Sequence, residues 1–186
     1  MARIDLPSLG DLTEAQRQQY DRFPSNLTRA LLRTSASTSG YLSLGASFLE
    51  GQIENRDREL VILRVGALSG SAYERMQHLP RAKQTGWTDQ DIAQIECGIG
   101  IDARTTDILS FVDECVKNVK VSDATFALAA KHLSQTQIAE LTLLIGHYVM
   151  TARFVETLAV DLDESATDWD NMRSSELDRT EVKVIK

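Results

Sequence analysis

Apolar positions along the chain recur with the three-to-four-residue period of helices, and segments that alternate like β-strands are nearly absent. Polar residues with the spacing of helix caps precede many of these segments, and Gly or Pro often follows the last apolar position. The pattern predicts helices at residues 13–23, 26–33, 37–50, 55–68, 71–85, 88–96, 106–119, 122–131 and 135–160. The sequence therefore predicts an all-α fold.

The helix predicted at residues 55–68 carries apolar side chains at nearly every position from Leu60 onward. Such a helix is buried on most sides, at the centre of a bundle or against a partner subunit. The short run from Leu60 to Val65 would also suit a β-strand, but the length of the whole segment and its charged lead-in favour a helix. Gly70 then allows the helix at residues 71–85 to fold back on it.

The chain of 186 residues is long enough for one domain with a substantial core. We expect a single helical domain over residues 1–160. After Asp161 the composition becomes acidic and loses its period, so residues 161–186 are predicted to form a tail that contacts a neighbouring subunit. The last six residues, 181–186, alternate like a strand without an evident partner.

Composition and charge narrow the possible partners. Twenty Lys and Arg against 27 Asp and Glu give a net charge of -7 and no basic stripe, which argues against nucleic acid and anionic membranes. The longest apolar stretch, around Leu141 to Met150, is too short to span a bilayer, and the N-terminus lacks the apolar core of a secretory signal. Two cysteines, Cys97 and Cys115, make no disulfide framework. A cytoplasmic location is expected.

Candidate chemistry gathers on the helix at residues 71–85. Ser71, Glu74 and His78 fall within about 60° of one another around that helix, so they share one face. Folding back the preceding helix would bring Glu59 into the same neighbourhood. A histidine held between carboxylates suits proton transfer at neutral pH. Taken alone, a Glu and a His four residues apart on a helix are more often an ordinary solvated pair. Together with the family resemblance described below, the arrangement predicts His78, Glu74 and Glu59 as catalytic residues, with His78 as the acid, Glu74 as its orienter or proton partner, and Glu59 as a base or supporting group.

Other residues have both a functional and a structural interpretation. Ser71 either contacts a ligand or caps its helix, and His147 is either a buried core histidine or part of a pocket wall. A substrate carboxylate could be held by Arg58, Arg64 or Arg75. Cys97 and Cys115 are expected to be idle thiols. Since the histidines are dispersed and no glycine-rich loop suits a phosphate, we expect no metal and no cofactor.

Several spaced motifs carry a family resemblance. They are Arg58-Glu59-Leu60 with Leu63, Tyr73 to His78, Gly86 to Ile92, and Gln137 to Tyr148 with Ala152. Over about residues 40–160 the chain resembles the carboxymuconolactone decarboxylase family of the alkyl hydroperoxidase D-like superfamily. The resemblance implies a helical bundle with an antiparallel helix pair at its core, assembled as a homo-oligomer, commonly a trimer or hexamer.

The thiol-dependent members of that superfamily carry a C-x-x-C pair at the positions that Ser71 and Glu74 occupy here, with His78 four residues beyond the second position. Peroxide reduction needs a thiolate and a resolving thiol, so this activity is disfavoured. The chain is more similar to the decarboxylase-like branch without the thiol pair, which implies acid/base chemistry on a small organic acid or lactone.

Three functions are therefore weighed. The first is a lyase-like enzyme that performs non-redox decarboxylation or related chemistry. The second is an alkyl hydroperoxidase D-like antioxidant with peroxiredoxin-type activity, which would have to proceed by an unconventional route. The third is a non-catalytic oligomeric ligand-binding protein that has kept the fold and lost the thiols.

Overall fold

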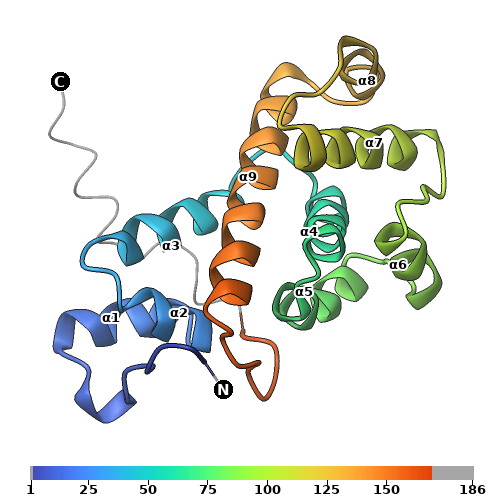
Figure 1. The fold of residues 1–186 in the computed structure, drawn as a ribbon. Helices are drawn as coiled ribbons and strands as arrows, with labels where there is room; N and C mark the ends of the chain where they lie inside the picture. The colour runs from blue at the N-terminus through green and yellow to red at the C-terminus, as the bar shows by residue number, and fades with distance from the viewer. Residues whose placement is uncertain (1, 169–186) are drawn as a thin grey trace, which may run out of the picture. The chain divides into compact units, whose positions relative to one another are not determined.

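A computed structural model describes residues 2–168, and over this range the chain is helical with no β-strand. The all-α prediction is confirmed, whereas the strand-like end at residues 181–186 lies outside the described residues. After a 3₁₀ turn at Leu9–Asp11, the helices are α1 (Glu14–Arg22), α2 (Asn26–Leu31), α3 (Ser37–Ser47), α4 (Asn55–Ser69), α5 (Ala72–Gln84), α6 (Asp89–Glu96), α7 (Ala103–Asn118), α8 (Asp123–Ala129) and α9 (Gln135–Thr157) (Figure 1).

Local caps explain where most helices begin. The Thr13 hydroxyl accepts from the Gln16 amide, and Thr88 does the same for Asp91, each within a complete capping box. The predicted start of the helix at residue 106 is too late, because Asp102 caps α7 and accepts a hydrogen bond of 2.7 Å from the Thr105 amide. This cap was missed because Asp102 lies among glycines and exposed isoleucines rather than directly before an apolar period.

The helices form two compact units. The terminal unit combines residues Met1–Glu50 with Leu158–Lys186, and the central unit comprises Gly51–Thr157. Whether the two units together form the single domain expected over residues 1–160 depends on how they associate, so that expectation stays a prediction. The motif-bearing helices α4 and α5 both belong to the central unit.

In the terminal unit, α1, α2 and α3 pack on one another, and the two ends of its chain meet. The Arg3 amide donates to the Leu158 carbonyl at 2.8 Å, and the Asn26 amide donates to the Asp163 carboxylate at 2.8 Å. The first residues of the predicted acidic tail therefore pack on their own chain. Contact of the tail with a neighbouring subunit stays a prediction.

In the central unit, α4 is the hub, because α5, α6, α7 and α9 all pack against it (Figure 1). Val61, Ile62 and Val65 have no exposed surface, which confirms a helix buried on most sides. At about 1.5 to 3 kcal/mol for each buried aliphatic side chain, α4 is a major source of the unit's stability. The polar side chains of its buried stretch, such as Glu59 and Arg64, consequently lie in the core.

Helices α4 and α5 form an antiparallel hairpin. Gly70 ends α4 in the left-handed region at φ 64°, where a side chain would be strained, and the Ser71 amide donates to the Gly66 carbonyl at 2.9 Å. Contacts then run in opposite directions along the two helices, with Gly66 beside Glu74 and Glu59 beside His78. A Cβ at residue 66 would lie 3.3 Å from the Glu74 Cβ, so glycine permits the close approach that brings Glu74 against α4.

Helix α9 alone among the helices of residues 2–168 is long and apolar enough, by length and composition, to cross a membrane. The sequence analysis considered only the shorter stretch around Leu141 to Met150. Half of the most apolar window of α9 is buried inside the protein, and the helix packs lengthwise on α4. A core helix passes the same length and composition test, so the test carries little weight here.

Val119, which follows α7, gives a prediction about the stability of the fold. It has φ 65°, an unfavourable region for a β-branched side chain, and it is 89% exposed. Val119→Gly should raise the free energy of unfolding by about 1 kcal/mol because strain is removed and little packing is lost. Val119→Ala, which keeps Cβ, should gain less. Urea denaturation of both variants measures the difference, and equal stabilities would contradict this assignment of strain.

Candidate active site

The centre of the site is the Glu59 carboxylate on α4, which has no exposed surface. Its Oε2 lies 2.8 Å from Nδ1 of His78 on α5. Its Oε1 accepts from Nε of Arg58 at 3.3 Å and from Nε of Arg81 at 3.4 Å. A carboxylate that is ionised can only accept, so Nδ1 of His78 is the donor and its Nε2 faces the other way.

Glu59 is ionised in spite of its burial. Burial alone would raise the pKa of this carboxyl, but the charge and hydrogen bond of His78 oppose it. The positive charges of Arg58 and Arg81 act in the same direction, so the pKa of Glu59 lies below its ordinary value. The His78 imidazole is therefore oriented by an anionic partner.

Glu74 lies on the opposite side of the imidazole and has the opposite protonation state. Its Oε2 is 3.8 Å from His78 Nε2, and its Oε1 is buried with no hydrogen-bond partner among residues 2–168. Burial, with a smaller contribution from the negative charge of Glu156, raises the pKa of Glu74 to about 8. At neutral pH this carboxyl is predominantly protonated, and it can donate a proton toward His78 or a bound molecule.

Helix α9 supplies an aromatic wall. The Tyr148 ring packs edge-on against the His78 imidazole with centroids 5.1 Å apart, and His147 packs on the same tyrosine at 5.2 Å. Burial, with a smaller contribution from the charge of His78, lowers the pKa of His147 to about 4. His147 is thus neutral at physiological pH. The wall restricts how the His78 ring can turn.

The structure brings Glu59, Glu74 and His78 together, as the motif spacing predicts. Ser71 is the N-cap of α5, and its hydroxyl accepts from the Glu74 amide at 3.4 Å. Arg58 lies in the site, and the His147 ring packs on Tyr148. The side chain of Arg75 instead forms an ion pair of 2.6 Å with Glu96 and is half exposed.

Arg64 also lies away from the site, since its guanidinium forms two hydrogen bonds, of 2.6 and 2.7 Å, with Asp113. Arg81 and Tyr148 also lie in the site, although neither is predicted there from the sequence. Arg81 follows His78 by three residues, a spacing that places both on one face of α5 and could have revealed it. Tyr148 gave no such signal, because only tertiary packing brings α9 to this site.

No group of three or more His, Cys, Asp or Glu side chains within residues 2–168 is arranged to hold a metal ion. Cys97 and Cys115 are both free thiols. Cys97 is exposed at the end of α6, whereas Cys115 on α7 is partly buried, which raises the pKa of its thiol. Neither cysteine is among the residues that contact Glu59 or His78.

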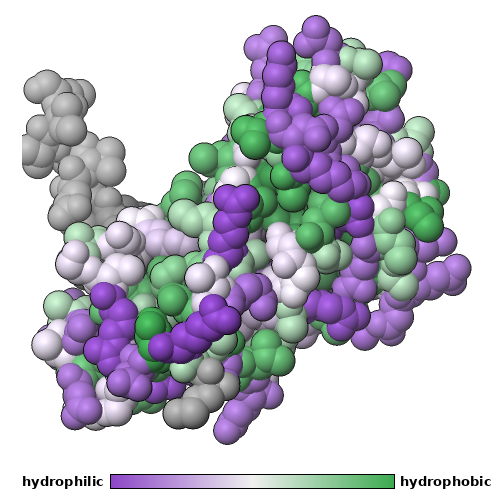
Figure 2. Space-filling model, viewed as in Figure 1, coloured by the Kyte–Doolittle hydropathy of each residue, from purple (hydrophilic) through white to green (hydrophobic). Residues whose placement is uncertain are grey.

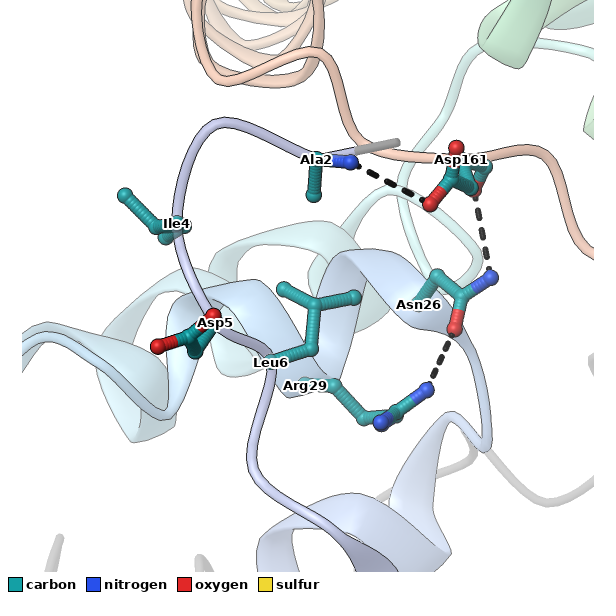
Figure 3. A pocket seen from close by; sticks show the side chains of 7 residues that line it. All are labelled: Ala2, Ile4, Asp5, Leu6, Asn26, Arg29 and Asp161. Atoms are coloured by element: carbon teal, nitrogen blue, oxygen red, sulfur yellow. Dashed lines mark hydrogen bonds between the residues drawn. The ribbon is translucent and has the colours of Figure 1, made fainter.

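A separate pocket of about 240 Å³ lies in the terminal unit. Its polar groups are bonded to one another: Arg29 donates to Asn26, Asn26 donates to the Asp161 carbonyl, and the Ala2 amide donates to the Asp161 carboxylate (Figure 3). The pocket shares no residue with the site on α4 and α5. Its lining consists of Ala2, Ile4, Asp5, Leu6, Asn26, Arg29 and Asp161.

Several solved structures have the same fold as this chain. Uncharacterized peroxidase-related proteins from Ralstonia eutropha, described as an alkylhydroperoxidase AhpD core, and from Silicibacter sp. match with TM-scores of 0.77 and 0.75 at 15% identity. Each match covers 88% of this chain and 93% or 92% of the other. A protein of unknown function from Agrobacterium tumefaciens, proposed as an antioxidant defence protein AhpD, matches with TM-score 0.65 at 18% identity, over 70% of this chain and 93% of the other.

These likenesses show that the chain has the alkylhydroperoxidase D-like fold. Residues 38–107, which include Glu59, Glu74 and His78, match the model of the carboxymuconolactone decarboxylase family. The expected resemblance to that family is confirmed over these residues, which are part of the chain. No curated protein matches the sequence.

The raised pKa of Glu74 predicts a specific dependence of stability on pH. The pKa of Glu74 is about 8 in the folded chain, against an ordinary value of 4.5. The contribution of Glu74 to the free energy of unfolding is therefore full below about pH 4.5 and is lost as the pH rises through 8. Between pH 5 and 8, the free energy of unfolding of the wild type should fall by about 1.4 kcal/mol per pH unit relative to that of Glu74→Gln.

Urea denaturation of both proteins at pH 5, 6, 7 and 8 measures this difference. Asp89→Asn removes a carboxylate whose side chain is 81% exposed, and its difference from wild type should stay constant over the same range. If the difference in free energy of unfolding between Glu74→Gln and wild type is also constant, Glu74 is ionised in the folded chain over the whole range from pH 5 to 8, which would contradict the prediction.

Proposed function

We propose that this protein is a carboxymuconolactone decarboxylase-like enzyme that transfers protons, without redox chemistry, during decarboxylation or a related reaction of a small carboxylate or lactone. The observation that carries the proposal is one imidazole placed between two buried carboxyl groups. Their surroundings shift the two pKa values in opposite directions. Divergent environments of paired titratable groups are a common arrangement in acid/base catalysis. The match of residues 38–107 to the model of the carboxymuconolactone decarboxylase family supports the same reaction class.

Each residue has a role that follows from its surroundings. Glu59 accepts from Nδ1 and fixes the tautomer of His78, so that Nε2 exchanges protons. When a carboxylate leaves as CO₂, its bonding electron pair stays on the substrate and must be stabilised and then protonated. His78 delivers that proton, Glu74 replaces it on Nε2, and solvent returns one proton to Glu74, so each turnover consumes one proton.

Thiol peroxidase activity is not proposed for this chain. Ser71 and Glu74 occupy the positions of the required cysteines, and neither side chain can form or resolve a sulfenic acid. Cys115 has a raised pKa, which lowers its thiolate fraction, and Cys97 lies outside the site. The term peroxidase-related describes the proteins from Ralstonia eutropha and Silicibacter sp. and not this chain.

The test is release of CO₂ from a panel of carboxylactones and small cyclic carboxylates. His78→Gln should lower the rate by about 10² to 10⁴, the usual contribution of general acid/base catalysis, and Glu59→Gln should lower it as well. His132→Gln is the matched control, because His132 forms its own 2.8 Å pair with Asp107 outside the site.

Unchanged turnover in His78→Gln would refute the mechanism. A compound that raises the melting temperature of wild type without being consumed would instead favour a non-catalytic ligand-binding protein. Peroxide consumption that disappears in a Cys97→Ser, Cys115→Ser double variant would favour the antioxidant function.

We also propose that the chain assembles into a trimer or hexamer and acts in the cytoplasm, without nucleic acid or membrane partners. Leu143 and Met150 support assembly, because they lie two helical turns apart on one face of α9 and are 53% and 47% exposed. Figure 2 shows apolar side chains at the surface beside α9 (Figure 2).

Light scattering after gel filtration tests this assembly. Wild type should elute as an oligomer, and Leu143→Glu with Met150→Glu should reduce its mass because charges would be buried at the interface. Val119→Glu, at an exposed apolar residue of another segment, should leave the mass unchanged. A monomeric wild type would exclude the proposal.

A further inference from the structure

Two guanidinium groups share one oxygen of the buried Glu59 carboxylate, and they differ in their surroundings. Arg58 Nε and Arg81 Nε lie 3.3 and 3.4 Å from Oε1. The Arg58 side chain is 5% exposed and also donates to Asn55 at 3.0 Å. The Arg81 side chain is 21% exposed, so it reaches from the buried carboxylate to the surface.

Arg81 lies on the same helix as His78, three residues later. The two side chains contact different oxygens of Glu59, since His78 contacts Oε2 and Arg81 contacts Oε1. Helix α5 thus holds both oxygens of a carboxylate that α4 presents. An unpaired carboxylate with no exposed surface would take up a proton, and a protonated Glu59 would no longer be an obligatory acceptor.

We propose that Arg81 is a positioning residue: together with Arg58 it holds the Glu59 carboxylate as the acceptor of Nδ1 of His78, and thereby leaves Nε2 as the reactive nitrogen. This inference rests on the proposed function for its chemical meaning. The contact between Arg81 and Glu59 is a property of the resting protein and is tested without substrate.

Some charged groups on α4 and on the helices packed against it lie at Glu59 or its imidazole partner, and others pair elsewhere. Arg58 is on α4 itself, and α5 contributes His78 and Arg81, with Glu74 beyond the imidazole. From α9, the His147 ring packs on Tyr148. On α7, Arg104 pairs with Asp57 and Asp113 pairs with Arg64, while on α6 Glu96 pairs with Arg75. Among the cations that contact Glu59, Arg81 is the more exposed arginine, so it can be replaced with less disturbance of the core than Arg58.

The experiment is a carboxyl ¹³C NMR titration of protein labelled at glutamate Cδ, in which the Glu59 signal is assigned by its loss in Glu59→Gln. In Arg81→Gln, Glu59 should take up its proton at higher pH than in wild type. Arg81→Lys, which keeps the charge, should restore most of the wild-type behaviour. Lys83→Gln removes a cation of the same helix that pairs with Asp89, and it should leave the Glu59 titration unchanged.

Acid unfolding followed by circular dichroism provides a second measurement. Because the pKa of Glu59 is lowered in the folded chain, its carboxylate stabilises the fold at pH values above the ordinary pKa of 4.5. This stabilisation is lost as the pH falls through the lowered pKa. Arg81→Gln should therefore unfold at higher pH than Lys83→Gln. In a Glu59→Gln background the Arg81→Gln change should no longer move that pH.

A Glu59 titration that is the same in wild type and Arg81→Gln would overturn the inference, as would an acid-unfolding shift that persists without Glu59. Neither result depends on turnover. Failure of His78→Gln to slow decarboxylation would count against the proposed function and would leave the role of Arg81 in holding Glu59 intact.

Discussion

A buried negative charge on α4 is the constraint on which the rest of the site depends. Glu59 sits in a helix whose neighbouring apolar residues form the core, so its carboxylate has no access to solvent. An uncompensated charge in such a place costs several kcal/mol, and the fold must therefore supply donors. His78, Arg58 and Arg81 are those donors. Because two of them come from α5, the same pairing also fixes the register of the α4–α5 hairpin.

The opposite pKa shifts of Glu59 and Glu74 follow from this register of the α4–α5 hairpin. Both carboxyls are buried, and burial raises the pKa of each. Glu59 has three positively charged or hydrogen-bonding partners that reverse the effect, whereas Glu74 faces the further negative charge of Glu156. Similar burial therefore produces an anion on one side of His78 and a neutral acid on the other. The imidazole lies in the short gap between them.

The sequence predicts this fold well where the determinants are local. Helix starts at Thr13 and Thr88 depend on side chains that bond to amides three residues away, so the pattern is visible in one dimension. The antiparallel hairpin follows from Gly70, and the meeting of Glu59 with His78 follows from the hairpin together with the family motif. Ser71 is the intermediate case, because a hydroxyl after a glycine predicts a cap and a ligand contact equally well.

Contacts between side chains of different helices could not be predicted from the sequence. Arg75 is on the same helix as Arg81, and nothing in the sequence reveals that Glu96 on α6 binds the first while Glu59 on α4 binds the second. Tyr148 enters the site because α9 packs along α4, a contact between segments separated by most of the central unit. Side-chain pairing across helices depends on helix rotation and crossing, which a hydrophobic period leaves open.

The substitution of two thiols in the motif changes what the same helix geometry can do. Ser71 keeps a local role, since its hydroxyl caps α5 and accepts from the Glu74 amide. Glu74 occupies the buried position beside His78, where a carboxyl holds a proton that a neutral solution would otherwise remove. A thiol pair there could exchange electrons through a disulfide, whereas a carboxylic acid can exchange only protons. With a buried carboxyl at this position, the pair of Glu59 and His78 is still in place, and under the proposed function Nε2 of His78 exchanges protons and takes no part in redox chemistry.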